Sequence, residues 1–201
     1  RFHPGRTDVV GLLCVRQAMK GGVSTIASTP AIHNAILARR PDLLDALFTD
    51  YWRSRFGEEG TGKDGSSTTR ATAYPLPIFG VVDGKFTSHY SLTFIEAAQL
   101  ADDIPKLSAA QKEAIDVLMA TAQELCFEMT LEPGDLQLIN SHVTYHGRTP
   151  FEDDADSGHD RLLLRLWLTM ANNRPLPAGH EVLWQSIEAG RPRGGIRQVS
   201  I

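Results

Sequence analysis

Two apolar, strand-like segments near opposite ends of the sequence constrain the fold most strongly. Residues 8–18 (DVVGLLCVRQA) form a continuous run rich in β-branched residues and leucine, and residues 161–170 (RLLLRLWLTM) form a second one. The first run is typical of a buried strand, and the second is a strong strand candidate. Because helical patterns fill much of the chain between them, we expect an α+β domain whose sheet is completed by distant segments.

Four segments between these runs carry helical signals. Thr29 and Pro30 are typical of the cap and first residue of a helix, and Asp42 is a typical cap for the next. Further along, apolar residues return at helical spacing in two longer segments. The predicted helices cover residues 29–40, 42–56, 91–103 and 108–126.

Two other segments predict a turn and a loop. Residues 74–91 predict a β-hairpin, because Asp83-Gly84 lies between two arms rich in strand-forming residues. Residues 57–70 (GEEGTGKDGSSTTR) lack periodicity, which is typical of a solvated surface loop. The spacing around Lys63 does not match a phosphate-binding loop, so no nucleotide site is predicted there.

Length and charge restrict the classes of partner. A chain of 201 residues suits one domain, which we expect to cover residues 1–201. The formal net charge is −4, so there is no basic excess that would favour nucleic acid. No apolar run approaches the length of a membrane span. We therefore expect neither a nucleic-acid nor a membrane partner; the sequence indicates no oligomeric state.

The cysteines and the first residues bear on location and completeness. Cys14 and Cys126 lie far apart in apolar stretches, which favours buried free thiols in a reducing, cytoplasmic compartment. Arg1 runs almost directly into a strand pattern without an initiator methionine. We therefore expect that the domain is truncated at its N-terminus and lacks its first elements.

Two of the seven histidines occur in a setting suited to chemistry. His3 and His146 each lie beside an apolar strand pattern, where a rigid scaffold can hold an imidazole in a fixed orientation. The other candidates lack such a setting and are interpreted as surface residues. These are His33, His89, His159 and His180.

Arg161 and Arg165 are four residues apart in a strand pattern, so their side chains project to the same face. An arginine among leucines requires an anionic partner, and its planar guanidinium can bind a carboxylate through two hydrogen bonds. That partner is either an internal aspartate or glutamate, or a bound anion.

Taken in order, these pieces form a recognisable set. They read FHPGRTDVVGLLC, GGVS, EPGDLQLINSHVTYHGRTPFED, RLLLRLWL and RPLP, and they extend over essentially the whole chain. The set resembles the 2-oxoglutarate- and iron(II)-dependent oxygenases of the taurine dioxygenase-like (TauD/TfdA) family. The order of the pieces, more than any single one, makes the resemblance specific.

The resemblance implies a double-stranded β-helix, a jelly-roll barrel of two facing sheets with flanking helices. It also implies a reaction. In such enzymes two histidines and one carboxylate bind one face of iron(II), and 2-oxoglutarate and oxygen take the remaining positions. 2-Oxoglutarate is converted to succinate and carbon dioxide while a small organic substrate is hydroxylated.

Carried over by position, the resemblance implies roles for individual residues. His3 corresponds to the first iron ligand and His146 to the distal one. Arg161 corresponds to the residue that pairs with the far carboxylate of 2-oxoglutarate, helped by the Ser24 hydroxyl.

Two further assignments remain open. Arg165 corresponds to a second anion contact, for the cosubstrate or for an acidic group such as a carboxylate on the substrate. The loop at residues 151–160 is longer than in the shortest family members, so the choice between Arg161 and Arg165 stays open. Asn140 corresponds to a polar position near the metal and cosubstrate, or else makes a strand-end hydrogen bond.

The sequence departs from the family pattern at Gly5. The family motif is His-x-Asp, and here it reads His3-Pro4-Gly5, with Asp8 aligned to a second aspartate further along. Loss of the carboxylate leaves two neutral imidazoles and should weaken iron binding severely. Asp8 is a poor substitute because its side chain would have to fold back over the intervening turn.

Three outcomes are compatible with Gly5. The chain is a hydroxylase whose metal site is altered; or chloride fills the position, as in related iron/2-oxoglutarate halogenases; or the protein is a non-catalytic relative. The missing side chain is expected to leave a space of about the size a halide needs. We also expect Gly5→Asp to raise iron affinity if His3 is a ligand.

Overall fold

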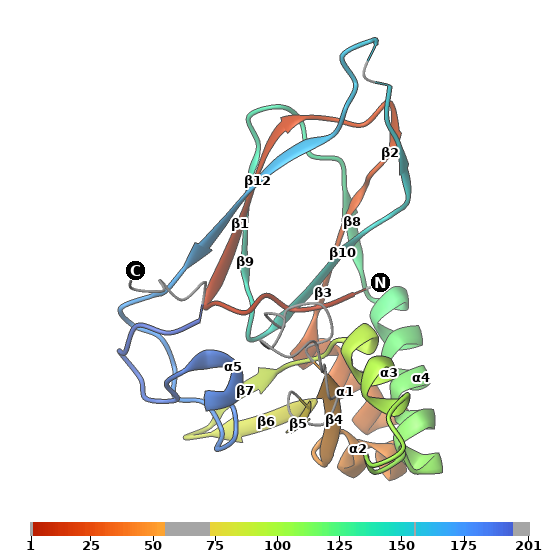
Figure 1. Cartoon of the computed structure of the whole chain (residues 1–201), viewed down its shortest axis with the longest axis vertical. Helices are drawn as coiled ribbons and strands as arrows, with labels where there is room; N and C mark the ends of the chain where they lie inside the picture. Colours follow the sequence, from red (N-terminus) through yellow and green to blue (C-terminus); the bar gives the residue numbers. More distant parts are fainter. Residues whose placement is uncertain (1, 55–72, 155, 195–201) are drawn as a thin grey trace, which may run out of the picture.

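The structure, a computed structural model, describes residues 2–54, 73–154 and 156–194. Antiparallel strands are mixed with helices, which confirms the predicted α+β class (Figure 1). The loop predicted at residues 57–70 lies outside the described residues.

The strands are β1 (Val9–Arg16), β2 (Lys20–Gly21), β3 (Ser24–Ser28), β4 (Asp50–Ser54), β5 (Ala73–Pro77), β6 (Phe79–Val82), β7 (Lys85–Ser88), β8 (Phe127–Met129), β9 (Leu136–Asn140), β10 (Thr144–Arg148), β11 (Phe151–Glu152) and β12 (Leu162–Leu168). The helices are α1 (Thr29–Arg39), α2 (Pro41–Leu47), α3 (Leu92–Gln99), α4 (Ala109–Glu124) and α5 (Glu181–Trp184).

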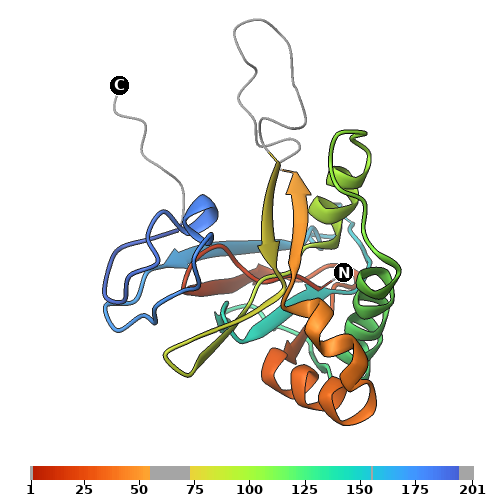
Figure 2. The same ribbon diagram turned by 90° about the horizontal axis from the view of Figure 1, so that it is seen from below.

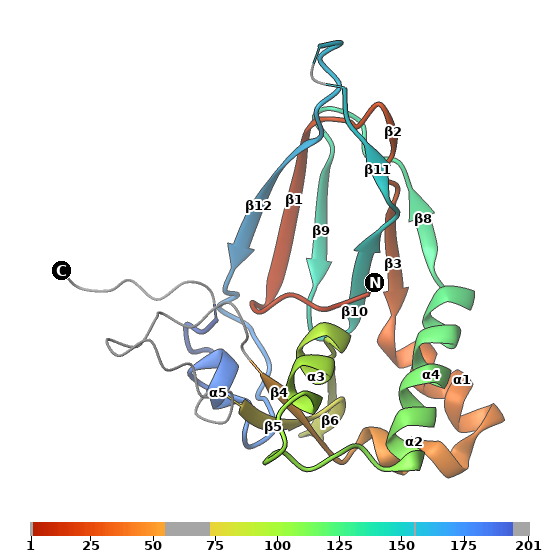
Figure 3. The same ribbon diagram turned by 45° about the vertical axis from the view of Figure 1, so that its right-hand side comes forward.

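Two three-stranded antiparallel sheets form the upper part of the molecule in Figure 1. Their strand orders are β12-β1-β9 and β10-β3-β8. The two apolar runs from opposite ends of the sequence are neighbours, because β1 pairs with β12 from Val9 opposite Leu168 onward. The prediction that distant segments complete one sheet is therefore confirmed. Figure 3 shows the strands of the two sheets converging towards the end where β2 pairs with β11.

Alternation along β1 directs one set of side chains between the sheets. Val10 and Leu12 are buried there and form a small apolar cluster with Ile139 of β9. Ile26 of β3, in the opposite sheet, packs against this cluster together with Leu163 of β12. The two sheets are thus joined through an apolar contact, and the polar residues discussed below lie around it.

Helices cover the other face of the β10-β3-β8 sheet. Ala27 and Tyr145 lie on that face and belong to the main apolar core. The same core contains Ile32 of α1, Leu47 of α2 and Leu118 of α4. Figure 2 shows these helices, in orange and green, on one side of the molecule, with the blue segment that follows β12 on the other.

Two of the predicted helices begin with a side chain that caps the backbone. Ser28 caps α1 by accepting a hydrogen bond from the Ala31 backbone, with proline in the first turn. Ser108 and Gln111 form a complete capping box at the start of α4. The helix predicted over residues 42–56 is too long, because α2 ends at Leu47 and the chain then enters β4.

The hairpin predicted around Asp83-Gly84 is present as β6 and β7. Asp83 has a φ of 48° and Gly84 a φ of 68°, as a two-residue turn between right-twisted strands requires. None of the helices in the described segments is both long and apolar enough to span a bilayer.

Candidate functional site

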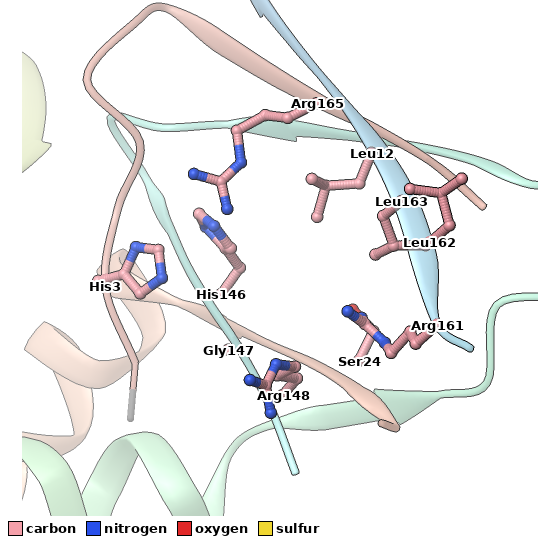
Figure 4. A pocket seen from close by; sticks show the side chains of 10 residues that line it. All are labelled: His3, Leu12, Ser24, His146, Gly147, Arg148, Arg161, Leu162, Leu163 and Arg165. Atoms are coloured by element: carbon pink, nitrogen blue, oxygen red, sulfur yellow. The ribbon is translucent and has the colours of Figure 1, made fainter. Parts of the chain in front are cut away.

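Two adjoining cavities meet at His3, His146 and Arg165. The first, about 530 Å³, is lined by residues of both three-stranded sheets, and we call it the inter-sheet cavity. The second, about 430 Å³, is lined by residues 3–6, by residues at the start of α3 and by Trp167, and we call it the α3 cavity. In Figure 4, Arg165 extends toward His146, whereas Arg161 and Ser24 lie together on the far side of the inter-sheet cavity.

A backbone bridge places the two histidines side by side. The His3 N–H donates to the His146 carbonyl at 2.9 Å, and the His146 N–H donates to the His3 carbonyl at 3.0 Å. Directly opposed residues of an antiparallel pair project their side chains to the same face. The two imidazole centroids are accordingly 4.3 Å apart, with 62° between the ring planes. The structure therefore brings the two predicted iron ligands together.

Burial disfavours the charged form of both imidazoles. Burial lowers the pKa of His146 to about 3, with further lowering by His3 and the Arg165 guanidinium. Burial also lowers the pKa of His3, opposed in part by its bond to the Pro4 carbonyl. In that bond Nδ1 lies 3.1 Å from the Pro4 oxygen, which leaves Nε2 as the ring nitrogen with a lone pair.

The histidine pair supplies only part of an iron site. Metal–nitrogen bonds of about 2.1 Å that meet at a right angle place imidazole centroids about 4.6 Å apart, close to the spacing here. Nδ1 of His146 is also buried without a hydrogen-bond partner in the described chain. However, no group of three metal-ligating side chains exists among residues 2–54, 73–154 and 156–194. The donors described here therefore do not fit a complete two-histidine, one-carboxylate site.

Gly5 leaves no space on its side-chain side, which corrects the sequence expectation. A Cβ built on Gly5 would lie 2.2 Å from Cγ2 of Val10 and 2.6 Å from Oγ of Ser141. The side chains of Val10 and Ser141 thus fill the space that was expected to accommodate a halide. The same contacts obstruct an aspartate introduced at this position.

Asp8 is committed to a buried network, as expected of a residue that does not ligate iron. Its carboxylate accepts hydrogen bonds from His142 Nε2 at 2.9 Å and from Arg193 Nε at 3.0 Å. The Met170 backbone and the Asn173 side chain donate to its other oxygen, each at 3.0 Å. Burial alone would raise the pKa of Asp8, but these hydrogen bonds lower it to about 2. Asp8 therefore fastens the start of β1 to the segment that follows β12.

Three arginines line the inter-sheet cavity without an acidic partner. Arg148, Arg161 and Arg165 form no ion pair with any other described residue. The Phe151 ring supports two of them, with the guanidinium carbon of Arg148 4.3 Å and that of Arg161 5.4 Å from its centroid. Burial lowers the pKa of Arg161, and the neighbouring Arg148 lowers it further. No carboxylate of the described chain forms an ion pair with the Arg161 guanidinium, although Asp153 accepts a hydrogen bond from the Arg161 backbone at 2.9 Å and acts on the guanidinium through its charge. The guanidinium N–H donors can therefore bind an anion.

Ser24 lines the same cavity from β3. Its hydroxyl donates to Oε1 of Gln137 at 3.1 Å, across the space between the two sheets. Gln137 also donates to the Met129 sulfur at 2.9 Å, so both ends of its amide are engaged. Ser24 thus lines the cavity, and its hydroxyl is engaged by Gln137, a residue that sequence reasoning did not identify.

Asn140 lines neither cavity. Its side-chain oxygen accepts a hydrogen bond from the His142 backbone at 3.0 Å, which closes the turn after β9. The structure thus shows the strand-end hydrogen bond that was the alternative interpretation, and it gives no support to a cosubstrate contact by Asn140.

Two histidines interpreted as surface residues are buried, and that prediction is wrong for them. His89 is 4% exposed and His180 is 2% exposed. Burial, the Arg53 guanidinium and the neighbouring His180 hold the pKa of His89 well below its ordinary value. His89 lines the α3 cavity, and its Nδ1 has no hydrogen-bond partner in the described residues.

Several residues that line the two cavities were given no role in the sequence analysis, and the sequence signals that could have identified them differ in strength. Trp167 shares a face of β12 with Arg161 and Arg165, so strand alternation could have identified it. Arg148 likewise shares a face with His146 two residues earlier. Arg6 and His89 carried no such signal, because they reach the α3 cavity through tertiary packing.

Comparisons with known proteins agree with this arrangement. The family model described as "Taurine catabolism dioxygenase TauD, TfdA family" matches residues 2–167. FR-33289 synthase of Streptomyces rubellomurinus is 34% identical over 183 residues, which are 88% of this chain and 51% of that protein. Clavaminate synthase 2 of Streptomyces clavuligerus is 30% identical over 109 residues, 54% of this chain and 30% of that protein. The chain thus spans about half the length of FR-33289 synthase.

Solved structures with the same fold include two iron oxygenases. Asparagine oxygenase in complex with Fe(II), hydroxyasparagine and succinate matches with a TM-score of 0.63 at 22% identity, over 84% of this chain and 49% of that one. The non-heme iron oxygenase OrfP in complex with Fe and alpha-ketoglutaric acid matches with a TM-score of 0.57 at 21% identity, over 84% and 49%. The match to residues 2–167 and the identity to FR-33289 synthase together show that the chain belongs to the taurine catabolism dioxygenase TauD, TfdA family.

Proposed function

We propose that the protein is an iron(II)- and 2-oxoglutarate-dependent oxygenase that hydroxylates a small organic molecule and releases succinate and carbon dioxide. One observation carries this proposal beyond family membership. An arginine-lined cavity of about 530 Å³ lies between the two sheets and has in its wall two histidines whose charged forms are disfavoured by burial. A dicarboxylate that must reach a metal at one end and a cation at the other requires such a cavity.

In this proposal Arg161 binds the far carboxylate of 2-oxoglutarate. Its guanidinium has no acidic partner in the described chain, and Phe151 holds it beside Arg148. Ser24 lines the same end of the cavity, and its hydroxyl would turn from Gln137 Oε1 to the carboxylate in order to donate to it. Leu12, Leu162 and Leu163 line the wall formed by β1 and β12 and provide apolar surface for the carbon chain of the cosubstrate.

The metal is assigned to the other end of the cavity. When bound, iron(II) activates oxygen at the expense of 2-oxoglutarate. His146 and His3 would provide neutral nitrogen ligands, and the carboxylate that completes the set is not among the described residues. We do not include chloride in the proposal, because the side chains of Val10 and Ser141 fill the space at Gly5.

Two finer features complete the proposal. We infer that the two facing sheets are part of a double-stranded β-helix, supported by the antiparallel orders β12-β1-β9 and β10-β3-β8. A cytoplasmic location is supported by the free thiols of Cys14, which is buried, and Cys126, which is partly exposed.

The test is anaerobic titration of the protein with iron(II) and then 2-oxoglutarate. A visible charge-transfer band that appears only with both components is expected, followed by succinate formation when oxygen and substrate are added. Arg161→Gln should reduce the band at a given 2-oxoglutarate concentration and leave iron binding alone unchanged. Absence of the band in the wild-type protein would sink both the hydroxylase proposal and the halogenase alternative.

A further inference from the structure

A buried glutamine crosses the space between the two sheets beside the inter-sheet cavity. Gln137 belongs to β9, where it lies opposite Leu12 of β1. At the other sheet, the Ser24 hydroxyl donates to its Oε1 at 3.1 Å, and its Nε2 donates to the Met129 sulfur at 2.9 Å. Ser24 and Met129 lie opposite each other on β3 and β8. Gln137 thus bridges the two sheets next to a residue that lines the cavity.

The contact with Met129 determines which end of the Gln137 amide faces Ser24. A thioether sulfur has no hydrogen to donate, so it accepts a hydrogen bond from Nε2 and has none to offer to Oε1. Oε1 therefore faces Ser24, and no other donor of the described residues reaches this oxygen. Gln137 is 9% exposed, and a buried amide oxygen is costly to leave without a donor. This cost opposes any movement of the Ser24 hydroxyl away from Gln137.

The Ser24 hydroxyl carries one proton and so donates to one acceptor at a time. In the structure that acceptor is Oε1 of Gln137. Ser24 also lies beside Arg161 at one end of the inter-sheet cavity (Figure 4). A carboxylate bound by Arg161 therefore gains the Ser24 hydrogen bond only when Gln137 loses it. The Gln137 oxygen and the bound carboxylate are competing acceptors for the same proton.

We propose that Gln137 sets the affinity for 2-oxoglutarate by competing with its far carboxylate for the Ser24 proton. The inference rests on the proposed function, since it takes Arg161 and Ser24 as the partners of that carboxylate. Gln137 itself lines neither cavity, so it is a positioning residue that acts through Ser24. Its presence makes the affinity for 2-oxoglutarate lower than a free Ser24 hydroxyl would allow.

Two variants at position 137 change the strength of the competing acceptor. Gln137→Met keeps an unbranched side chain of similar length and removes the amide oxygen, so 2-oxoglutarate should bind about three- to tenfold more tightly, as one neutral hydrogen bond contributes. Gln137→Glu supplies a carboxylate that accepts the proton more strongly and repels a second anion, so 2-oxoglutarate should bind about tenfold more weakly. Affinity is measured by anaerobic calorimetry with iron(II) present, and circular dichroism establishes that each variant is folded.

A double-mutant cycle establishes that the effect passes through Ser24. Without the hydroxyl there is no proton to release, so Gln137→Met should leave the affinity unchanged in a Ser24→Ala background. Conversely, Ser24→Ala should change the affinity little when Gln137 is present, and lower it about three- to tenfold in Gln137→Met. The matched control is Gln123→Met on the exposed face of α4, because the Gln123 amide also contacts a sulfur, that of Cys126 at 3.6 Å. This control should bind 2-oxoglutarate like the wild type.

Glutarate provides a second measurement that does not depend on a metal. It has the chain length of 2-oxoglutarate and lacks the keto group that would contact iron. In metal-free protein we expect the same order of affinities for glutarate, with Gln137→Met tightest, the wild type intermediate and Gln137→Glu weakest. A merely structural role for Gln137 predicts no gain, since loss of a buried bridge between the sheets would lower stability without tightening the binding of any ligand.

The outcomes separate this inference from the proposed function. If folded Gln137→Met binds neither dicarboxylate more tightly, or if its gain persists in the Ser24→Ala background, the inference is wrong, while a charge-transfer band in the wild type would still support the proposed function. If the wild type forms no band but glutarate follows the expected order, the proposed function is wrong and the competition at Ser24 stands. If neither dicarboxylate binds any of the folded proteins, both are wrong.

Discussion

Gly5 is enclosed by its neighbours, and a side chain there should be costly. A Cβ would lie 2.2 Å from Val10 Cγ2. Because Val10 is buried in the apolar cluster between the sheets, it cannot move away freely. We predict that Gly5→Ala lowers the free energy of unfolding by about 1–3 kcal/mol, measured by chemical denaturation. Gly11→Ala is the graded control, since its Cβ would meet Leu166 Cβ at 3.2 Å and should cost less.

The same close contacts around Gly5 change the iron affinity that we expect of Gly5→Asp. Gly5→Asp was expected to restore an iron ligand, but its side chain would start from a position that Val10 and Ser141 occupy. We now expect this variant to be destabilised and to bind iron(II) no more tightly than the wild type in an anaerobic titration. A stable variant with tighter iron binding would show that residues 3–6 adopt a different path.

Asp8 should make the free energy of unfolding depend on pH in the acid range. Its folded-state pKa of about 2 lies below the ordinary value, so its contribution is complete above the unfolded-state pKa of about 4. That contribution is lost as the pH falls from about 4 through 2. Asp8→Asn also leaves the buried Arg193 without its carboxylate. We predict a loss of about 3 kcal/mol at pH 7 that shrinks toward pH 2, measured by denaturation at a series of pH values.

A surface ion pair provides the control for Asp8. Asp160 pairs with Arg16 at 2.7 Å, and both side chains are nearly half exposed. Asp160→Asn should therefore cost no more than about 1 kcal/mol at pH 7. Equal losses for the two variants would contradict the view that burial of the network around Asp8 makes it important.

At the scale of elements, Arg161, which directly precedes β12, and Arg165 within β12 should bind anions with different strength. Arg161 lines only the inter-sheet cavity of the two adjoining cavities, whereas Arg165 lines both. We predict that Arg161→Gln weakens 2-oxoglutarate binding about tenfold or more and that Arg165→Gln weakens it less, as measured by calorimetry. The reverse order would assign the cosubstrate carboxylate to Arg165, the choice that the sequence left open.

Elements whose apolar residues follow one clear strand or helix pattern could be predicted from the sequence. β1 and β12 carry continuous apolar runs, and α4 carries helical spacing behind a capping box. β4 was missed because apolar residues at helical spacing continue past Leu47 into the strand. Its alternation of buried Tyr51 and Arg53 with a less buried Trp52 between them spans too few residues to outweigh that signal.

The sequence could predict the positions of site residues only where the residues lie in or beside strands. Arg161, Arg165 and His146 lie in or beside strands whose alternation fixes the face they occupy. Arg6 and His89 meet at the α3 cavity through the packing of residues 3–6 beside α3 and the loop that precedes it. No local periodicity encodes that packing, so the α3 cavity could not be predicted without the structure.

At the scale of the whole molecule, one sheet face remains uncovered in the described structure. Leu138 of β9 is 60% exposed and Leu164 of β12 is 50% exposed. They lie on either side of β1, on the face opposite to Leu12, with Leu136 and Leu166 beside them. An apolar face of this kind promotes association through contact with other apolar surfaces.

This face should tolerate charge, and its opposite face should not. We predict that Leu138→Lys and Leu164→Lys each cost less than about 1 kcal/mol of stability, because neither leucine is packed. Both should reduce binding of a dye that reports exposed apolar surface, and reduce self-association measured by light scattering. Leu12→Lys, on the buried face of the same sheet, is the control and should prevent folding. If the two outer substitutions were as damaging as Leu12→Lys, polypeptide outside the described residues would have to cover this face, and the two leucines would be part of a core.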